Sequence, residues 1–70
     1  MMLMTVVVND RAMEIAVDST AADLLAHLGL DPARVAVVVG ADIIGRSDLA
    51  GRVLRPGDII ELVSFVGGGS

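Results

Sequence analysis

Apolar residues along this chain occur in short runs separated by turn-forming residues, a pattern typical of β-strands. The first run covers residues 5–8. In the second, residues 12–17, apolar side chains alternate with small or charged ones, so that one face is apolar. Asn9 and Asp10 stand between the two runs, and such side chains favour turns because they bond to nearby backbone. The pattern predicts an antiparallel hairpin.

After Thr20 the spacing of apolar residues changes to that of a helix. Thr20 can cap a helix N-terminus, and Asp23, three residues on, completes a weaker form of the capping box. Gly29 stands where a helix often ends in a left-handed residue, and Pro32 opposes any continuation. We therefore predict a helix over residues 21–28, with a buried stripe made of Ala21, Leu24, Leu25 and Leu28.

The second half of the chain predicts three more strands. Residues 35–39 are rich in β-branched side chains and read as a buried strand, and residues 43–44 form a very short one. The segment that follows is expected to be mostly loop, with one helical turn at residues 47–50. Residues 55–58 contain Pro-Gly, a strong turn signal. Residues 59–66 are predicted to be the last and longest strand.

The order strand–strand–helix–strand–strand–strand predicts an α+β domain over residues 1–66, followed by a flexible glycine tail over residues 67–70. One short helix can bury its stripe only by packing across one face of a four- or five-stranded sheet. Because the helix lies in the crossover, the first and last strands can pair in parallel, which makes the sheet mixed. The predicted architecture is a β-grasp, or ubiquitin-like, fold.

Alternation divides the last strand between two faces. Glu61 should be solvated, so we assign its face to the open side of the sheet. The inward set is Ile60, Leu62 and Val66, and the outward apolar set is Ile59, Val63 and Phe65. An exposed apolar patch suggests a partner surface, unless a loop or the N-terminal methionines cover it. We assign four residues as partner-binding: the outward set and the residue that precedes the tail. They are Ile59, Val63, Phe65 and Val66.

The tail, Gly67-Gly68-Gly69-Ser70, has neither helix nor strand character, and glycines cost backbone entropy when ordered. Fully extended it reaches roughly 13 Å, at about 3.3–3.6 Å per residue. Because glycine has no side chain, this tail can thread a narrow channel and present a carboxyl group to a partner's chemistry. The alternative interpretation is a flexible linker.

Composition removes several classes of function. The 70 residues contain no cysteine and no lysine, and nine acids against five arginines give a net charge of −4. This excludes disulfide scaffolds and cysteine nucleophiles, and it argues against nucleic acid, which needs clustered cations. Apolar runs are too short to span a membrane, and no signal peptide is recognisable, so we expect a cytoplasmic protein.

The remaining polar candidates carry little chemistry. His27, in the last turn of the predicted helix, is interpreted as a solvated surface residue. Arg46, Arg52 and Arg55 lie in the second half of the chain. They are either solvated or paired within the domain, or they steer docking by meeting acids on a partner.

Nearly the whole chain resembles the ThiS family, the ubiquitin-like sulfur carriers of thiamine biosynthesis. No single motif carries this resemblance, which depends on the order and spacing of several short ones. They are Val6-Val7-Val8-Asn9-Asp10, Thr20 before Asp23-Leu24-Leu25, Val37-Val38-Val39-Gly40, Ile43-Ile44 followed by Arg46, Gly57-Asp58, and Val63-Ser64-Phe65-Val66-Gly67-Gly68-Gly69.

The resemblance implies a co-substrate and not an enzyme. A partner activating enzyme uses MgATP to adenylate the C-terminal glycine carboxylate, and sulfur from a persulfide donor then gives a thiocarboxylate. Thiazole synthase takes that sulfur into the thiazole ring of thiamine. Carried onto this chain, the family pattern makes Gly69 the reactive residue and Gly67 and Gly68 the threading residues, with no cofactor bound by the chain itself.

Two positions depart from the family pattern. Family members normally end at the second glycine of the pair, whereas Ser70 follows here, so Gly69 can react only once Ser70 is gone. The family also often has Pro-Arg where this chain has Gly45-Arg46, which concerns the local loop shape. Alternative functions are a sulfur carrier for molybdopterin or cysteine synthesis, a β-grasp interaction module without activation chemistry, and a ubiquitin-like tag.

Overall fold

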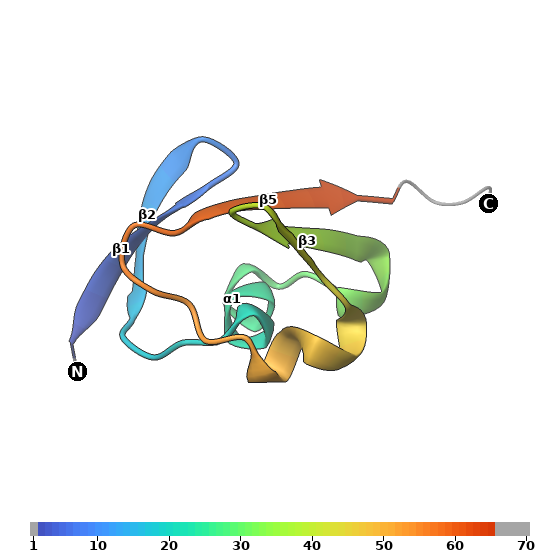
Figure 1. Ribbon diagram of the computed structural model, residues 1–70, viewed down its shortest axis with the longest axis horizontal. Coiled ribbons are helices and arrows are strands. Elements are labelled where there is room, and N and C mark those ends of the chain that lie inside the picture. Colours follow the sequence, from blue (N-terminus) through green and yellow to red (C-terminus); the bar gives the residue numbers. More distant parts are fainter. Residues whose placement is uncertain (1, 66–70) are drawn as a thin grey trace.

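The computed structural model describes residues 2–65, which form one five-stranded sheet with a helix packed on one face (Figure 1). The strand order is β2-β1-β5-β3-β4, and β1 pairs with β5 in parallel while all other pairs are antiparallel. The mixed sheet and its single helix α1 are therefore as predicted. The elements are β1 (Leu3–Val8), β2 (Arg11–Ala16), α1 (Ala21–Leu28), η1 (Pro32–Arg34), β3 (Val35–Val39), β4 (Asp42–Ile44), η2 (Arg46–Gly51) and β5 (Ile59–Ser64).

The β1–β2 hairpin closes with a two-residue loop. Val8 pairs with Arg11, and both loop residues are left-handed, with φ of 49° at Asn9 and 69° at Asp10. Two left-handed residues make a type I′ turn, whose twist matches that of the flanking strands. Asparagine and aspartate are among the few non-glycine residues that adopt this conformation readily. The predicted hairpin is confirmed.

Helix α1 begins and ends as the sequence predicts. Asp23 N donates to Thr20 Oγ1 at 3.1 Å, and Thr20 N donates to Asp23 Oδ2 at 3.0 Å, which completes the capping box. Gly29 ends the helix at φ 71°. The predicted stripe is wrong at one position, because Leu28 is 39% exposed. Leu30, beyond the turn, packs against the core instead.

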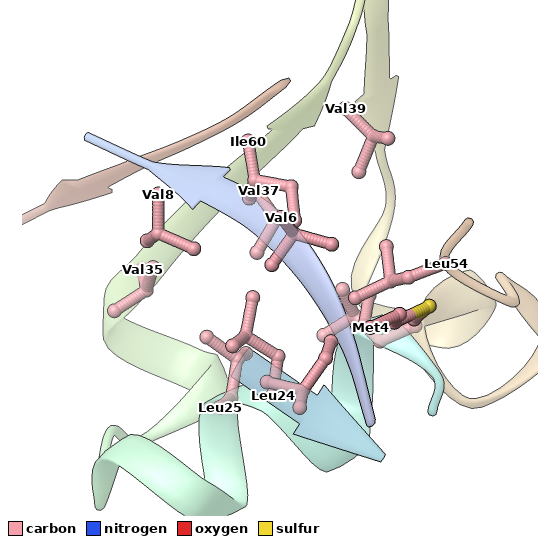
Figure 2. Packing of buried hydrophobic residues seen from close by; sticks show 13 residues of the cluster. Met4, Val6, Val8, Leu24, Leu25, Val35, Val37, Val39, Leu54 and Ile60 are labelled. Carbon is pink, nitrogen blue, oxygen red and sulfur yellow. The ribbon is translucent and has the colours of Figure 1, made fainter. Parts of the chain in front are cut away.

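The core fills the space between the sheet and α1, as Figure 2 shows. Alternate residues of β1 and β3 point into it, and Ile60 of β5 lies between them with no exposed surface. Leu24 and Leu25 of α1 meet these strands from the opposite side (Figure 2). The strand contributions are Met4, Val6 and Val8 from β1 and Val35, Val37 and Val39 from β3. Within residues 2–65 α1 is the only α-helix, and because it packs on this face, no α-helix covers the other face.

The predicted helical turn at residues 47–50 is a longer 3-10 helix, η2, whose Leu49 reaches the core. The predicted turn at residues 55–58 is present, with Gly57 at φ 83° and Asp58 N donating to Arg55 O at 3.1 Å. Gly45 has φ −66°, a value that proline also adopts, so the loop keeps a backbone compatible with the family's Pro-Arg.

Strand β5 is shorter than predicted. It covers six residues, the same length as β1 and β2, so among residues 2–65 it is not the longest strand. Its ladder with β3 ends where β3 begins, at the pair Val35–Ser64. Val66, predicted to be its last residue, lies outside the described residues. No helix within residues 2–65 has the length and apolar character needed to cross a membrane.

Candidate functional site

Strand β5 leads the chain toward the predicted reactive tail, so the candidate site consists of this strand, its flanking backbone and its open face. In Figure 1 the β5 arrow points away from the β1–β2 hairpin. The sequence-predicted residues Val66, Gly67, Gly68 and Gly69 lie outside the described residues. The structure therefore shows what holds the chain in place as far as Phe65, which is the last described residue.

On one side, β3 holds β5 over almost its whole length. Five residue pairs join the two strands, from Val39–Ile60 to Val35–Ser64. One more hydrogen bond continues beyond the strand, because Phe65 N donates to Arg34 O at 2.8 Å. Backbone pairing thus fixes the path of the chain up to its last described residue.

On the other side, β1 pairs with β5 at only two positions. Where β1 ends, the side chain of Asn9 forms the next hydrogen bonds to β5. Asn9 N donates to Ile60 O at 2.9 Å. The Asn9 side chain then forms two hydrogen bonds with one residue: Leu62 N donates to Oδ1 at 2.8 Å, and Nδ2 donates to Leu62 O at 3.2 Å. The carboxamide therefore replaces a strand residue and extends the ladder along β5.

Sequence analysis assigns Asn9 to a turn and to a family motif, and neither assignment predicts these two hydrogen bonds. Turn geometry explains why an asparagine tolerates φ 49°. It does not indicate that the side chain reaches a residue 53 positions away. No pattern in a single sequence carries that information, because the contact arises from the parallel pairing of β1 with β5.

The three outward residues of β5 and its extension are exposed as predicted. Ile59 is 53% exposed, Val63 54% and Phe65 59%, so no loop within residues 2–65 covers them. Glu61 lies between Ile59 and Val63 on the same face. We refer to this side of the sheet as the open face.

Strand register extends the open face beyond β5. Val7 stands opposite Ile59, Ala36 opposite Val63, and Val38 opposite Glu61. Ile43 of β4 pairs with Val38 and is 81% exposed. Sequence analysis missed Ile43, because a three-residue strand is too short for alternation to assign its faces. The open face is thus largely apolar across four neighbouring strands, β1, β5, β3 and β4.

All three arginines agree with the interpretation that they are solvated or paired within the domain, and their role in docking stays a prediction. Arg52 Nη1 lies 3.1 Å from Asp42 Oδ2, an ion pair that ties the start of β4 to the end of η2. Arg46 and Arg55 are exposed, and so is His27 in the last turn of α1. Ion pairs at the surface contribute little to stability. Within residues 2–65, no group of three or more histidine, aspartate or glutamate side chains is arranged to hold a metal ion.

Comparison with known proteins decides the family. The pattern of the ThiS family matches residues 6–69, which includes every segment of the site. The chain belongs to the ThiS family. A curated relative, the thiazole synthase of Paramagnetospirillum magneticum, is 36% identical over 67 residues, which make up 96% of this chain and 21% of that protein. The chain thus spans about a fifth of the length of this relative.

Two solved structures share the fold of this ThiS-family chain. The crystal structure of the thiamine biosynthesis protein ThiS from Geobacter metallireducens has a TM-score of 0.80 at 25% identity, and covers 94% of this chain and 100% of that one. An NMR structure of a thiamine biosynthesis protein from the same organism has a TM-score of 0.78 at 26% identity, covering 96% and 90%. The predicted β-grasp fold is confirmed.

Replacing Asn9 by alanine tests the side-chain extension of the β5 ladder. Asn9→Ala removes both bonds to Leu62 and places alanine at φ 49°, so we expect a loss of about 2–3 kcal/mol in the free energy of unfolding. Asp10→Ala is the matched control, because it carries the same left-handed penalty of about 1–2 kcal/mol without those bonds. Urea denaturation measures both values.

Amide hydrogen exchange locates the effect. The Leu62 amide should exchange faster in Asn9→Ala than in Asp10→Ala when both are compared at equal global stability. Equal exchange at Leu62 in the two variants would contradict the role assigned to Asn9.

Proposed function

We propose that this protein is a sulfur carrier of thiamine biosynthesis, and that Gly69, once terminal, carries the sulfur as a thiocarboxylate. The observation that carries the proposal is the ThiS family match, which runs through the glycine tail to residue 69. The geometry supports it, since the strand before the tail is paired on both sides. On this proposal the protein is a co-substrate and not an enzyme.

The chemistry takes place on the terminal carboxyl group. A carboxylate oxygen attacks the α-phosphorus of ATP in the activating enzyme, pyrophosphate leaves, and an acyl adenylate forms. The terminal sulfur of a persulfide then attacks the acyl carbon and AMP leaves. A thiol finally breaks the sulfur–sulfur bond, which yields the glycyl thiocarboxylate and a disulfide. Removal of Ser70 must come first, because only then does Gly69 supply the carboxyl group.

In this series of reactions, partner enzymes supply every catalytic group, and the chain itself binds no cofactor. MgATP is the substrate of the activating enzyme. Gly67 and Gly68 have no side chains, which lets the tail enter a narrow channel leading to that enzyme's active site. The paired backbone of β5 holds the chain in place as far as Phe65, the last described residue before the tail. Holding a reacting group in place removes entropy from the reaction barrier.

The open face is the proposed docking surface for the activating enzyme and for thiazole synthase. Its exposed apolar side chains, with Phe65 next to the tail, are of the kind that form the centre of protein interfaces. Val66 continues this segment into the tail. Similarity of this chain to part of a protein named thiazole synthase supports that enzyme as the acceptor, in preference to a molybdopterin or cysteine pathway.

Intact-mass measurement tests the proposed modification. The form ending at Gly69 is incubated with the activating enzyme, MgATP and a persulfide donor, and one oxygen should be replaced by sulfur. The forms ending at Gly68 and at Ser70 are matched controls that differ by one residue, and both should keep their mass. An unchanged mass for the Gly69 form, with an enzyme that modifies a known ThiS protein, would contradict the proposal.

Replacing Phe65 by alanine tests the docking surface. Phe65→Ala should weaken binding to the activating enzyme about tenfold or more, because aromatic side chains near an interface centre often contribute about 2 kcal/mol. Leu28→Ala is the control, since Leu28 is also a partly exposed apolar residue but lies on α1, away from the open face. Titration calorimetry measures both affinities. Equal affinities for the two variants would show that the open face does not dock.

A further inference from the structure

Strand β2 forms one edge of the sheet, and its outer side has no strand partner within residues 2–65. The two-residue loop makes Val8–Arg11 a hydrogen-bonded pair, so backbone groups of β2 alternate from there between β1 and the outside. Arg11, Met13 and Ile15 bond toward β1. The N–H and C=O groups of Ala12 and Glu14 therefore point outward, as an exposed template for another strand.

The outer edge of β2 is closed at one end and open along the rest. Ala16 O accepts hydrogen bonds from Ser19 N at 3.1 Å and from Ser19 Oγ at 2.6 Å, which leaves only its N–H available for a partner. The open part thus runs from Ala12 to Ala16. Its outward side chains on the open face are two alanines around Glu14, small enough to let another backbone approach.

A hollow of about 350 Å³ lies beside this open edge, between β2 and α1. Ile15 and Leu24 form its floor, and Leu3, which is 55% exposed, adds apolar surface to its wall. Glu14, Asp23 and His27 surround it. A strand paired with β2 would point every second side chain toward α1 and into this hollow, and the alternate ones toward the open face beside Glu14.

These features specify the chemistry of the occupant. Side chains that enter the hollow must be apolar, because its floor is made of Ile15 and Leu24. Side chains on the other face meet the carboxylate of Glu14, so a basic residue complements it. A second copy of this chain fits poorly. Antiparallel pairing of two β2 strands about their centre places Glu14 directly opposite Glu14, which is unfavourable.

The geometry points to the outer edge of β2 and the adjoining hollow as a binding site for an extended segment of a partner protein, in which apolar and basic residues alternate. The segment adds as a sixth strand, and its backbone bonds to Ala12 and Glu14 while an apolar side chain fills the hollow. This site lies at the opposite edge of the sheet from β4. It does not depend on the sulfur-carrier proposal.

A capped peptide of seven residues, with lysine at odd and isoleucine at even positions, is the probe. It is added to the ¹⁵N-labelled protein, and amide chemical shifts are followed by NMR. We expect saturable shifts at Ala12, Glu14 and Ala16, and also at Asp23 and His27 beside the hollow. Shifts confined to the open face around Val63 and Phe65, or no saturable shift at millimolar peptide, would overturn the proposal.

Backbone methylation of the peptide separates strand pairing from charge attraction. Two derivatives carry N-methyl groups either at all lysine or at all isoleucine positions, which blocks opposite edges of the same strand. One derivative should bind about as tightly as the parent and the other at least about tenfold more weakly, because the blocked edge loses its bonds to β2. Equal affinities of the two derivatives would overturn strand addition.

Variants of the protein give an independent test. Ala12→Pro removes an outward N–H at an edge position that tolerates proline, and it should weaken peptide binding about fivefold or more. Ala12→Val adds bulk at the same position but keeps the N–H, so it should bind within about twofold of the unaltered protein. Sedimentation without peptide checks self-association. A dimer abolished by Ala12→Pro would assign the edge to a second copy and overturn the proposal.

Discussion

The parallel pairing of β1 with β5 is the interaction on which the rest of this structure depends. It joins strands that are about fifty residues apart in the sequence through a short series of backbone bonds. Gly57 N donates to Thr5 O at 2.8 Å, Val7 N to Asp58 O at 2.9 Å, and Asn9 N to Ile60 O at 2.9 Å. Closing such a long loop costs entropy, and the buried core on one side of this ladder must offset that cost. With β1 and β5 joined, β2 pairs with β1 on one side, and β3, with β4 beyond it, pairs with β5 on the other.

This central pairing also explains how the two faces of the sheet come to differ. The helix in the crossover between β2 and β3 can pack on one face only, and there it buries Leu24 and Leu25 against the strands. The other face stays open, with apolar side chains that a monomer has no reason to keep exposed. On the proposed function, in which partner enzymes supply the catalysis, this face serves as the docking surface, because the strand that supplies Val63 precedes the tail in the chain.

Local signals along the sequence predicted most of the fold. The Thr20–Asp23 capping box, the left-handed Gly29 and the turn around Gly57 each depend on residues within a few positions, and all are present. Leu28 was mispredicted because helical spacing identifies a stripe but not how far the sheet covers it. Strand β5 was predicted too long because its end is set by its partner β3, which begins at Val35.

The sequence predicted only those features of the candidate site that depend on residues close together in the chain. Alternation of side chains along β5 was enough to predict that Ile59, Val63 and Phe65 are exposed, because the charged Glu61 identifies the solvated face. The bonds from Asn9 to Leu62 and the position of Ile43 depend on strand register, which a single sequence does not encode in any short motif. The free edge of β2 likewise follows from strand order, and that order is fixed only when β1 meets β5.

Transfer of labelled sulfur from the thiocarboxylate to the thiazole ring tests whether this protein is the sulfur carrier. The form ending at Gly69 is loaded with ³⁴S as its thiocarboxylate and incubated with thiazole synthase and the enzyme's other substrates, and the thiazole product is analysed by mass spectrometry. If the protein is the carrier, the thiazole will contain ³⁴S, and one labelled atom will be transferred for each chain that returns to the carboxylate. Thiazole formed without the label, while the thiocarboxylate stays intact, would contradict it.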